Sequence, residues 1–273
     1  MAKLPKIYRS SIPNVSIIGA GIIGMSCALE LTRRGASVTL HDKRVRGRGA
    51  SVAAAGMLSP AFEAASEEGA HPKLFDLCME SARIWPDYAS DLEARTKSDL
   101  SYCRGNTLAV AMDSKDEDHL RKLRSSLEVR GVSYEAVSPE EACEREPCLS
   151  SSNRGGLHLP TDGRVDNRAV FRELSRLADY ENRLTCRDNE PHLAQTSEGL
   201  RVEGADCVVL AAGYETPRIA VRQSSDKDIS AFEPALTNIL PVSGQMLAVK
   251  PEAPLTTTIR AGSLYVTPRD GAA

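Results

Sequence analysis

The stretch that decides the fold is Val15-Ser-Ile-Ile-Gly-Ala-Gly-Ile-Ile-Gly24, near the start of the chain. Its apolar beginning, residues 15–18, predicts a buried strand. Gly19, Gly21 and Gly24 then form a G-x-G-x-x-G turn, which opens into a helix expected to run to about residue 34. In this motif the first glycine permits a tight turn, the second lets the backbone approach a pyrophosphate, and the third lets the helix pack on the strand. The anion lies at the helix N-terminus, where unpaired N–H groups face it.

The residues after this turn make the motif specific. Gly35 is expected to end the helix, residues 38–40 form a second strand, and Asp42 follows at the distance that lets it accept a hydrogen bond from a ribose 2′-hydroxyl. A lone G-x-G-x-x-G is a weak signal. The strand before it, the helix after it and the acid beyond together predict a dinucleotide site rather than a glycine-rich turn without a ligand.

Composition excludes several classes of protein. The chain has 273 residues, which is enough for one large or two ordinary domains. Its net charge of −3 gives no excess of positive charge that would attract nucleic acid or an anionic membrane. Seven cysteines without a C-x-x-C pair and five histidines without a cluster predict reduced thiols, no metal site and a cytoplasmic location. The start of the chain has no secretory signal, and the apolar run 15–31 is too interrupted for a membrane span.

A second segment has the composition of a ligand-binding surface. The basic glycine-rich loop 43–49 precedes Ala50-Ser-Val-Ala-Ala-Ala-Gly-Met-Leu-Ser-Pro60. Small side chains let the backbone lie against a flat ligand, and Ser51 is able to donate to a phosphate oxygen. For any one arginine of the loop, a solvated turn is an equal alternative to a phosphate contact.

The remaining pattern alternates helices and strands. Apolar spacing predicts a helix over 71–95, and a capping box at Ser138 predicts a further helix start. The apolar residues that recur at helical spacing in 71–95 are Leu74, Leu77, Cys78, Ile84, Tyr88 and Leu92. Asp166 is expected to cap another helix. Asp206-Cys-Val-Val-Leu-Ala-Ala-Gly213 reads as a central parallel strand whose end, at Gly213, meets the ligand crevice. The other predicted elements are strands over 107–112, 155–160, 240–249 and 262–267, a helix over 116–130 and a loop over 226–229.

These segments together resemble the FAD-dependent amine oxidases of the D-amino-acid oxidase type, and among them the bacterial glycine oxidases of thiamine biosynthesis. The resemblance extends from about residue 14 to the end of the chain. Ala-Ala-Gly-Met-Leu, residues 54–58, is its most family-specific part, because NAD-dependent dehydrogenases share only the first fingerprint. The matching segments are 17–24, 49–58, 163–166, 208–213, 241–247 and 265–269.

The resemblance implies roles for individual residues. Tyr265 would lean over the substrate, and Met57 would face both substrate and flavin, so these two are the catalytic candidates. His192 would contact the adenine end through its main chain, in place of the usual valine. The implied cofactor-binding residues are Gly19, Gly21, Ile22, Ile23, Gly24, Asp42, Lys43, Ala50, Ser51, Ala55, Gly56, Met57, His192 and Gly213.

The chain also departs from the family pattern. Family members continue beyond residue 271 with an arginine that pairs with the substrate carboxylate and a last glycine-rich segment against the flavin. Arg269 is not expected to replace that arginine, so we expect the 273-residue chain alone to be a poor catalyst. The turn 213–216 also lacks the usual tryptophan.

The predicted fold is α/β, with a discontinuous Rossmann-like FAD-binding domain and a second, antiparallel-sheet substrate domain. The predicted ranges are 1–13 for an N-terminal extension, 14–99 and 156–220 for the FAD-binding domain, and 100–155 and 221–273 for the substrate domain, the last incomplete.

The reaction implied is oxidative deamination of glycine or another small amine by FAD, with hydride transfer from the substrate Cα and O2 as electron acceptor. It would give a 2-oxo acid, ammonia and hydrogen peroxide. No side-chain base is required, because positioning of a deprotonated amine does most of the work.

No nucleic-acid or membrane partner is expected, and homo-oligomerisation stays open. Three alternatives remain: a D-amino-acid or sarcosine-type oxidase or dehydrogenase, an NAD(P)-dependent dehydrogenase whose arginine loop holds a 2′-phosphate, and an FAD-binding fragment or subunit.

Overall fold

The computed structural model describes residues 12–44, 46–66, 72–196, 199–222, 239–250 and 254–269. The chain divides into two compact units, each described by itself: unit 1 comprises Met1–Ala53 and Phe171–Gln245, and unit 2 comprises Ala54–Val170 and Met246–Ala273. The predicted N-terminal extension up to residue 11 and the loop 226–229 lie outside the described residues. The predicted domains assign 54–99 and 156–170 to the cofactor-binding half, and these boundaries stay a prediction.

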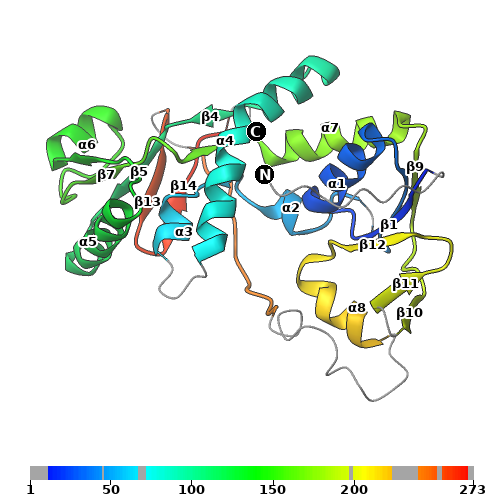
Figure 1. Ribbon diagram of the computed structural model, residues 1–273. Helices are drawn as coiled ribbons and strands as arrows, with labels where there is room; N and C mark the ends of the chain where they lie inside the picture. Colours follow the sequence, from blue (N-terminus) through cyan, green and yellow to red (C-terminus); the bar gives the residue numbers. More distant parts are fainter. Residues whose placement is uncertain are drawn as a thin grey trace. The chain divides into compact units, whose positions relative to one another are not determined.

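Unit 1 is built on a four-stranded parallel sheet in the order β12-β1-β2-β9 (Figure 1). The predicted strand–turn–helix–strand unit is confirmed as β1, α1 and β2, and Gly35 adopts a φ of 95° just after the helix. The elements of unit 1 are β1 (Asn14–Ile18), α1 (Ile22–Arg33), β2 (Ser37–His41), α2 (Ala50–Ala53), β9 (Leu184–Arg187), β10 (Leu193–Thr196), β11 (Gly199–Val202), β12 (Cys207–Leu210), the 3₁₀ turn η1 (Gly213–Glu215) and α8 (Thr216–Arg222).

The position of β12 differs from the prediction of a central strand. Among the described residues β12 pairs only with β1 and forms an edge of the sheet. Its apolar run is instead covered from one side by a small core that contains Ile18 of β1, Leu193 of β10 and Ile219 of α8. An apolar run of four residues is therefore compatible with an edge strand when neighbouring elements cover it.

Helix α7 (Asn167–Tyr180) carries the chain from unit 2 into unit 1. Asp166 caps it as predicted, since its carboxylate accepts hydrogen bonds from the N–H groups of Arg168 at 2.9 Å and Ala169 at 3.1 Å.

Unit 2 contains a five-stranded sheet in the order β14-β13-β5-β7-β6 and a three-stranded sheet in the order β3-β8-β4. The pairings are antiparallel, as predicted for this part of the chain, except that β13 and β5 run parallel. The elements are β3 (Met57–Leu58), α3 (Phe62–Ser66), α4 (Pro72–Thr96), β4 (Cys103–Arg104), β5 (Thr107–Val110), α5 (Ser114–Val129), β6 (Glu135–Val137), α6 (Pro139–Arg145), β7 (Gly156–His158), β8 (Gly163–Arg164), β13 (Thr258–Ala261) and β14 (Leu264–Val266).

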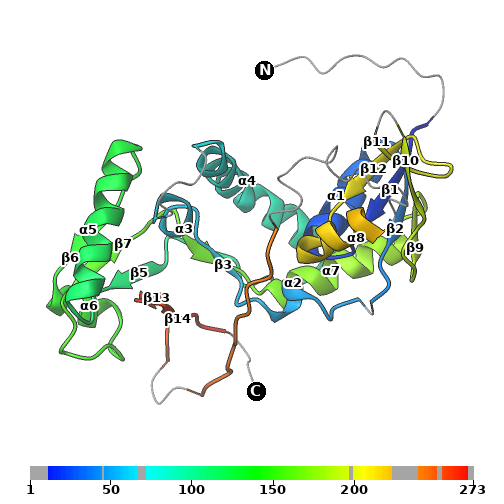
Figure 2. The ribbon, with the colours of Figure 1, turned by 90° about the horizontal axis from the view of Figure 1, so that it is seen from below.

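The main core of unit 2 lies between α5 and the larger sheet (Figure 2). Leu120, Leu123 and Leu127 recur at helical spacing on the buried face of α5, which Asp113 caps. The predicted capping box of α6 is also present, because Ser138 and Glu141 each accept a hydrogen bond from the other's backbone N–H.

Helix α4 forms where it was predicted, but its buried face contains only part of the predicted apolar set. Leu92 is buried and Cys78 packs against the core, whereas Leu74, Leu77 and Ile84 are 42%, 66% and 48% exposed. The other buried side chains are Phe75, Ala82 and Ala89. Buried and exposed positions both recur at helical spacing, so periodicity alone does not distinguish them. Small alanines let the backbone of the helix approach its neighbours. The helix therefore buries two alanines while larger apolar side chains stay exposed, which hydrophobicity alone does not predict.

The strand predicted over 240–249 is absent, since residues 239–250 have no regular secondary structure. Val242 and Leu247 are 93% and 87% exposed, and no other described segment pairs with them. Alternating apolar residues form a strand only when a neighbouring strand is available.

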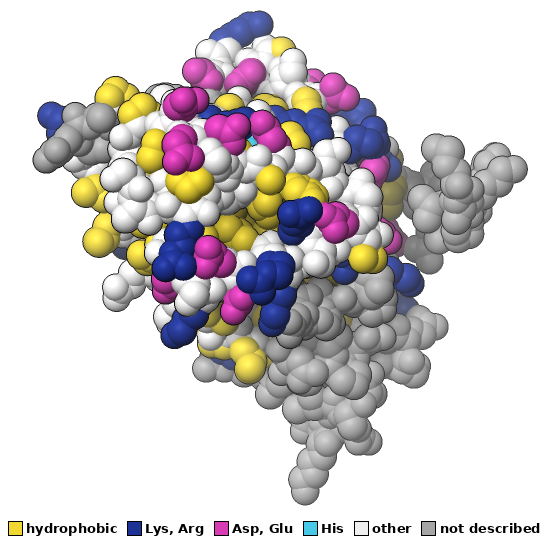
Figure 3. Space-filling model, turned by 90° about the vertical axis from the view of Figure 1, so that its left-hand side faces the viewer, with side chains coloured by type: hydrophobic (Ala, Val, Ile, Leu, Met, Phe, Trp, Pro, Cys, Tyr) yellow, Lys and Arg dark blue, Asp and Glu magenta, His cyan; other side chains and the backbone are white. Residues whose placement is uncertain are grey.

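The face of the molecule that carries α5 and α6 has mixed charge (Figure 3). Acidic and basic side chains are interspersed over it with hydrophobic groups between them, and many are paired, for example Arg145 with Glu135 and Arg154 with Glu117 at 2.8 Å. Among the described residues, no helix combines the length and the apolar composition needed to cross a bilayer.

Candidate functional site

The glycine-rich turn joins β1 to α1 in unit 1, and packing explains two of its three glycines. Gly19 has a φ of 106°, and a Cβ atom on it would lie 2.4 Å from the carbonyl oxygen of Ala211. A Cβ atom on Gly24 would lie 1.8 Å from the carbonyl oxygen of Gly19. These two glycines therefore allow the strand, the turn and the helix to approach one another closely.

Gly21 differs from the other two because no backbone crowds it. It is the N-cap residue of α1 in an extended conformation, and a Cβ atom on it would meet only the Ser51 hydroxyl oxygen, at 3.2 Å. The first-turn N–H groups of an α-helix have no acceptor within the helix, and the hydroxyl of Ser51 accepts the one from Ile22 at 3.0 Å. The small residue at position 21 thus keeps the helix N-terminus open to an incoming group.

Asp42 follows β2 and reaches back to the turn. One carboxylate oxygen accepts from the N–H of Ala20 and the other from the N–H of Arg44, both at 2.9 Å. The carboxylate therefore fixes the loop that it belongs to and the glycine-rich turn at once. Its two oxygens offer about four acceptor positions, so two such bonds leave acceptor capacity for ribose hydroxyls.

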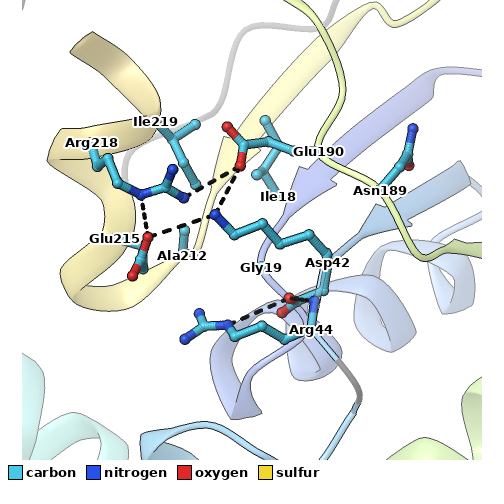
Figure 4. Close-up of a pocket in the computed structure, with 11 residues that line it drawn as sticks. Ile18, Gly19, Asp42, Arg44, Asn189, Glu190, Ala212, Glu215, Arg218 and Ile219 are labelled. Atoms are coloured by element: carbon cyan, nitrogen blue, oxygen red, sulfur yellow. Dashed lines mark hydrogen bonds and ion pairs between the residues drawn. The ribbon is translucent and has the colours of Figure 1, made fainter. Parts of the chain in front are cut away.

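Asp42 lines an open pocket of about 280 Å³, a volume that includes the solvent at its mouth (Figure 4). The side chains of Arg218, Glu215 and Glu190 point toward one another, and Lys43 Nζ lies 3.4 Å from Glu190 and 4.0 Å from Glu215. The hydrogen bond from Arg218 lowers the pKa of Glu215, and the positive charges of Lys43 and Arg44 act in the same direction. The pocket is lined by Ile18, Gly19, Asp42, Lys43, Arg44, Asn189, Glu190, Ala212, Glu215, Arg218 and Ile219.

The charges of this lining balance, with three cationic and three anionic side chains. In the arginine-rich loop, Arg44 Nε lies 3.7 Å from Asp42, and Arg46 is paired with Asp179 at 2.8 Å. A 2′-phosphate needs an uncompensated cation, which the lining of this pocket does not supply, so the pocket favours an adenosine with free ribose hydroxyls over NADP.

The other residues predicted for unit 1 lie around this pocket or apart from it. Gly213 begins η1, directly after the lining residue Ala212, and His192 is an exposed residue between β9 and β10. Ile23 is 65% exposed on the first turn of α1. Ala50 and Ser51 form the start of the short helix α2.

The predicted flavin-side residues lie in unit 2. Ala55 is buried, and Gly56 has a φ of 83° with the carbonyl oxygen of Val165 2.0 Å from the position of a Cβ atom. Met57 forms β3 and stands directly opposite Arg164 of β8. Close packing within unit 2 thus explains the small residues at positions 55 and 56.

Tyr265 lies on β14, with Arg260 of β13 directly opposite. Its hydroxyl donates to the sulfur of Met246 at 2.9 Å. The guanidinium of Arg260 stacks 3.8 Å from the Phe62 ring centroid, pairs with Glu63, and has its Nη1 atom 3.9 Å from the sulfur of Met57. Arg260 thus joins the two catalytic candidates, Tyr265 and Met57, through one side chain.

Sequence reasoning missed Arg260. Arg269, which is not expected to replace the family arginine, is paired with Asp166 at 3.1 Å and donates to the amide oxygen of Asn167. The turn at 262–263 folds Arg260 back against Tyr265. The sequence signal that could have found it is the glycine at position 262, at the centre of a short hairpin.

Comparison with known proteins shows the family to which the chain belongs. The sequence pattern of the DAO family, described as FAD dependent oxidoreductase, matches residues 14–272. The glycine oxidase of Geobacillus kaustophilus is 27% identical over 270 residues, which are 94% of this chain and 67% of that protein. Its crystal structure superposes with a TM-score of 0.71 at 25% identity, over 94% of this chain and 68% of that one.

Two further relatives extend the comparison. The bifunctional protein ThiO/ThiG of Trichormus variabilis is 27% identical over 266 residues, 94% of this chain but 38% of that protein. The structure of iminodiacetate oxidase from Chelativorans sp. BNC1 has a TM-score of 0.61 at 26% identity, over 75% of this chain and 56% of that one. The chain thus spans about two thirds of the length of the glycine oxidase, 56% of the iminodiacetate oxidase and 38% of the bifunctional protein. Because the family pattern covers nearly all of it, the chain belongs to the DAO family of FAD dependent oxidoreductases.

Proposed function

We propose that this chain carries the FAD-dependent oxidative deamination of glycine or another small amine or D-amino acid, giving a 2-oxo acid, ammonia and hydrogen peroxide. The similarity to glycine oxidase and to a ThiO/ThiG protein supports the assignment, and a role in thiamine biosynthesis is part of the same proposal. The observation that carries it is the arrangement around Gly21, together with the family pattern over residues 14–272.

The donors and acceptors of unit 1 suit FAD. The helix N-terminus at Gly21 offers the N–H group of Ile23 to a pyrophosphate, and Ile22, whose N–H donates to the Ser51 hydroxyl, is proposed to lie beside it. Asp42 offers acceptors to the adenosine ribose. Lys43, Ala50 and Ser51 are proposed to continue this contact, His192 to meet the adenine end through its main chain, and Gly213 to border the site. These roles rest on the resemblance and on the position of each residue.

In unit 2, Ala55, Gly56 and Met57 are proposed to lie beside the isoalloxazine ring, and Tyr265 over the substrate. FAD, when bound, supplies a hydride acceptor and passes the electrons to O2. The contribution of the chain is to hold the Cα–H of the neutral amine toward the ring, which is mainly a matter of positioning. Arg260 fixes the ring of Tyr265, and it also lies against the sulfur of Met57.

The test is the reaction of FAD-loaded chain with glycine, sarcosine, D-alanine and L-alanine, with peroxide as the readout. We expect peroxide with at least one of the first three, at the low rate expected of this chain alone, and a loss of that signal in Tyr265→Ala. The surface variant Tyr180→Ala, at a side chain that is 79% exposed, is the matched control. Bound FAD that no amine in the panel reduces would contradict the proposal.

Similarity to iminodiacetate oxidase supports a second candidate, a secondary amine with two carboxylates as substrate. The same panel extended by iminodiacetate distinguishes the two. A kcat/KM for iminodiacetate at least tenfold above that for glycine would favour this second candidate.

A further inference from the structure

The hydroxyl of Tyr265 has a methionine as its acceptor, a contact that the proposed function does not use. Tyr265 Oη donates to the sulfur of Met246 at 2.9 Å, and both residues belong to unit 2. A thioether sulfur is a weak hydrogen-bond acceptor. Arg260 faces the ring of the same tyrosine, with its guanidinium carbon 5.8 Å from the ring centroid. Two different side chains thus hold the ring of Tyr265 and its hydroxyl.

The side chain of Met246 is open to solvent. It is 45% exposed and lies in the segment 239–250, which has no regular secondary structure. Met112, two residues after β5, is 39% exposed, whereas Met25 of α1 is completely buried. Met246 and Met112 are therefore similarly accessible to small solutes. Of these three methionines, Met246 is the one whose sulfur accepts a hydrogen bond from a residue proposed to face the substrate.

The other methionine of the site, Met57, has different surroundings. It is half-buried in β3, and Nη1 of Arg260 lies 3.9 Å from its sulfur. A sulfur that reacts with an electrophilic oxidant supplies an electron pair, and a positive charge beside it makes that pair less available. Burial and charge thus favour reaction at Met246 over reaction at Met57.

Hydrogen peroxide, a product of the proposed reaction, oxidises methionine to methionine sulfoxide. A lone pair of the sulfur attacks one peroxide oxygen, the O–O bond breaks, and the leaving hydroxide takes the proton of the transferred oxygen to form water. The sulfur loses two electrons and the peroxide gains them, so no further reactant is needed. A thioether sulfur has two lone pairs, and the hydrogen bond from Tyr265 leaves one of those of Met246 free.

Oxidation of Met246 would change the contact with Tyr265, because it replaces an apolar thioether by a polar, chiral sulfoxide. An oxygen added on the side of Tyr265 occupies the place of the hydroxyl, which lies 2.9 Å from the sulfur. An oxygen added on the opposite side withdraws electrons from the sulfur and weakens it as an acceptor. In both cases the hydroxyl of Tyr265 loses its present partner.

We propose that Met246 is a site of oxidation by hydrogen peroxide, through which the product of the reaction lowers the activity of the chain. The source of the peroxide and the role of Tyr265 rest on the proposed function, whereas the oxidation site rests on the exposure of Met246 and on its contact with Tyr265. The modification is reversible, since methionine sulfoxide reductases restore the thioether.

Oxidation by added hydrogen peroxide tests the site without requiring turnover. The FAD-loaded chain is treated with peroxide, and peptide mass spectrometry gives the oxidation rate of each methionine. Met246 and Met112 should be oxidised about ten times faster than the buried Met25, or more, and Met246 faster than Met57.

Removal of the Tyr265 hydroxyl tests the contact in the same experiment. Tyr265→Phe keeps the ring but frees the second lone pair of Met246, and should speed its oxidation about two- to tenfold, the effect of one hydrogen bond. Tyr180→Phe, at a tyrosine that is 79% exposed, is the matched control and should leave that rate unchanged.

The consequence for the site is measured as the rate at which an amine reduces the bound FAD, with each variant compared before and after peroxide treatment. Treatment should slow the wild-type chain about two- to tenfold, and a methionine sulfoxide reductase should restore its rate. Met246→Leu, a change that conserves volume, should be insensitive to the treatment, whereas Met112→Leu should be slowed as much as the wild-type chain.

Three results would overturn the inference. The first is oxidation of Met246 no faster than that of Met25, the second is the same rate of Met246 oxidation in Tyr265→Phe and in the wild-type chain, and the third is an equal loss of rate in treated Met246→Leu and wild type. Failure of the proposed function is distinguishable: if no amine reduces the flavin, the oxidation rates with added peroxide still decide whether Met246 is the oxidation site and whether Tyr265 controls it.

Discussion

Arg260 lies directly across the β13–β14 pair from Tyr265, with its guanidinium carbon 5.8 Å from the centroid of the tyrosine ring. The same guanidinium stacks on Phe62 and is 9% exposed. Little water therefore screens its contacts with the two rings. Its carboxylate partner Glu63, by contrast, is 55% exposed at the side chain.

We predict that the ring contacts of Arg260 stabilise unit 2 more than its ion pair does. Arg260→Met should lower the free energy of unfolding by about 1–3 kcal/mol, because desolvated cation–π contacts are worth up to about 2 kcal/mol. Glu63→Gln should cost about 0–1 kcal/mol, as is usual for an exposed ion pair. Urea unfolding of both variants measures this, and an equal cost for the two would show that the ion pair carries the stabilisation.

Asp162 is the basis of a prediction about pH. This aspartate is fully buried and accepts from the N–H groups of Ala61 at 2.7 Å and Phe62 at 3.0 Å. Burial raises its pKa from 3.8 to about 7, against the opposing effect of those two hydrogen bonds and of Arg260. Between these values the folded chain holds a proton that the unfolded chain has released. The free energy of unfolding should therefore fall as pH rises from about 4 to 7, by up to roughly 4 kcal/mol.

Asp162→Asn should remove most of that slope, since an amide does not titrate. Urea midpoints at pH 5 and pH 8 provide the measurement. The variant should lose little stability between the two values, whereas the wild-type chain should lose more. A slope that persists unchanged in Asp162→Asn would assign the pH dependence to another group.

Asp42 is predicted to contribute to FAD affinity as well as to the loop. Asp42→Ala should weaken FAD binding by about 1.5–3 kcal/mol, the range for a hydrogen bond to a charged group. Asp42→Asn should lose less, because its amide oxygen still accepts one of the two backbone N–H groups that the carboxylate holds. Asp206→Asn is the matched control, since Asp206 also accepts a backbone N–H at 2.9 Å, from Asn14, but precedes β12 at the other end of the parallel sheet. Equal FAD dissociation constants for Asp42→Ala and the wild-type chain would show that Asp42 holds its loop but does not contribute to FAD binding.

Local sequence rules predicted the elements whose determinants lie within a few residues. The turn at Gly19–Gly24, the caps at Ser138 and Asp166 and the helix α5 all depend on short-range hydrogen bonds or on one helical period, and all are present. The edge position of β12, the buried face of α4 and the absence of a strand over 240–249 depend on which distant segments pack beside them. A pattern within one segment does not contain that information.

The residues of the candidate site also differ in whether short-range sequence or packing between distant segments determines their position. The sequence identified Gly21 and Asp42, whose spacing is fixed by one strand–helix–strand unit, and the structure brings them to one turn. It did not identify Arg260, since this arginine is brought to Tyr265 by pairing between two strands on opposite sides of a turn.

Binding of FAD by Gly21→Val tests the pyrophosphate site most directly. Gly21 has only the Ser51 hydroxyl near its Cβ position, so a larger residue there is compatible with the fold but fills the space before the helix N-terminus. Gly49→Ala, at a glycine with no atom near its Cβ position and no positive φ, is the matched control. After incubation with FAD and removal of free cofactor, the wild-type chain and Gly49→Ala should keep the flavin absorption, while Gly21→Val should lose it with an unchanged circular dichroism spectrum. Retention of FAD by Gly21→Val with the wild-type dissociation constant would contradict the account.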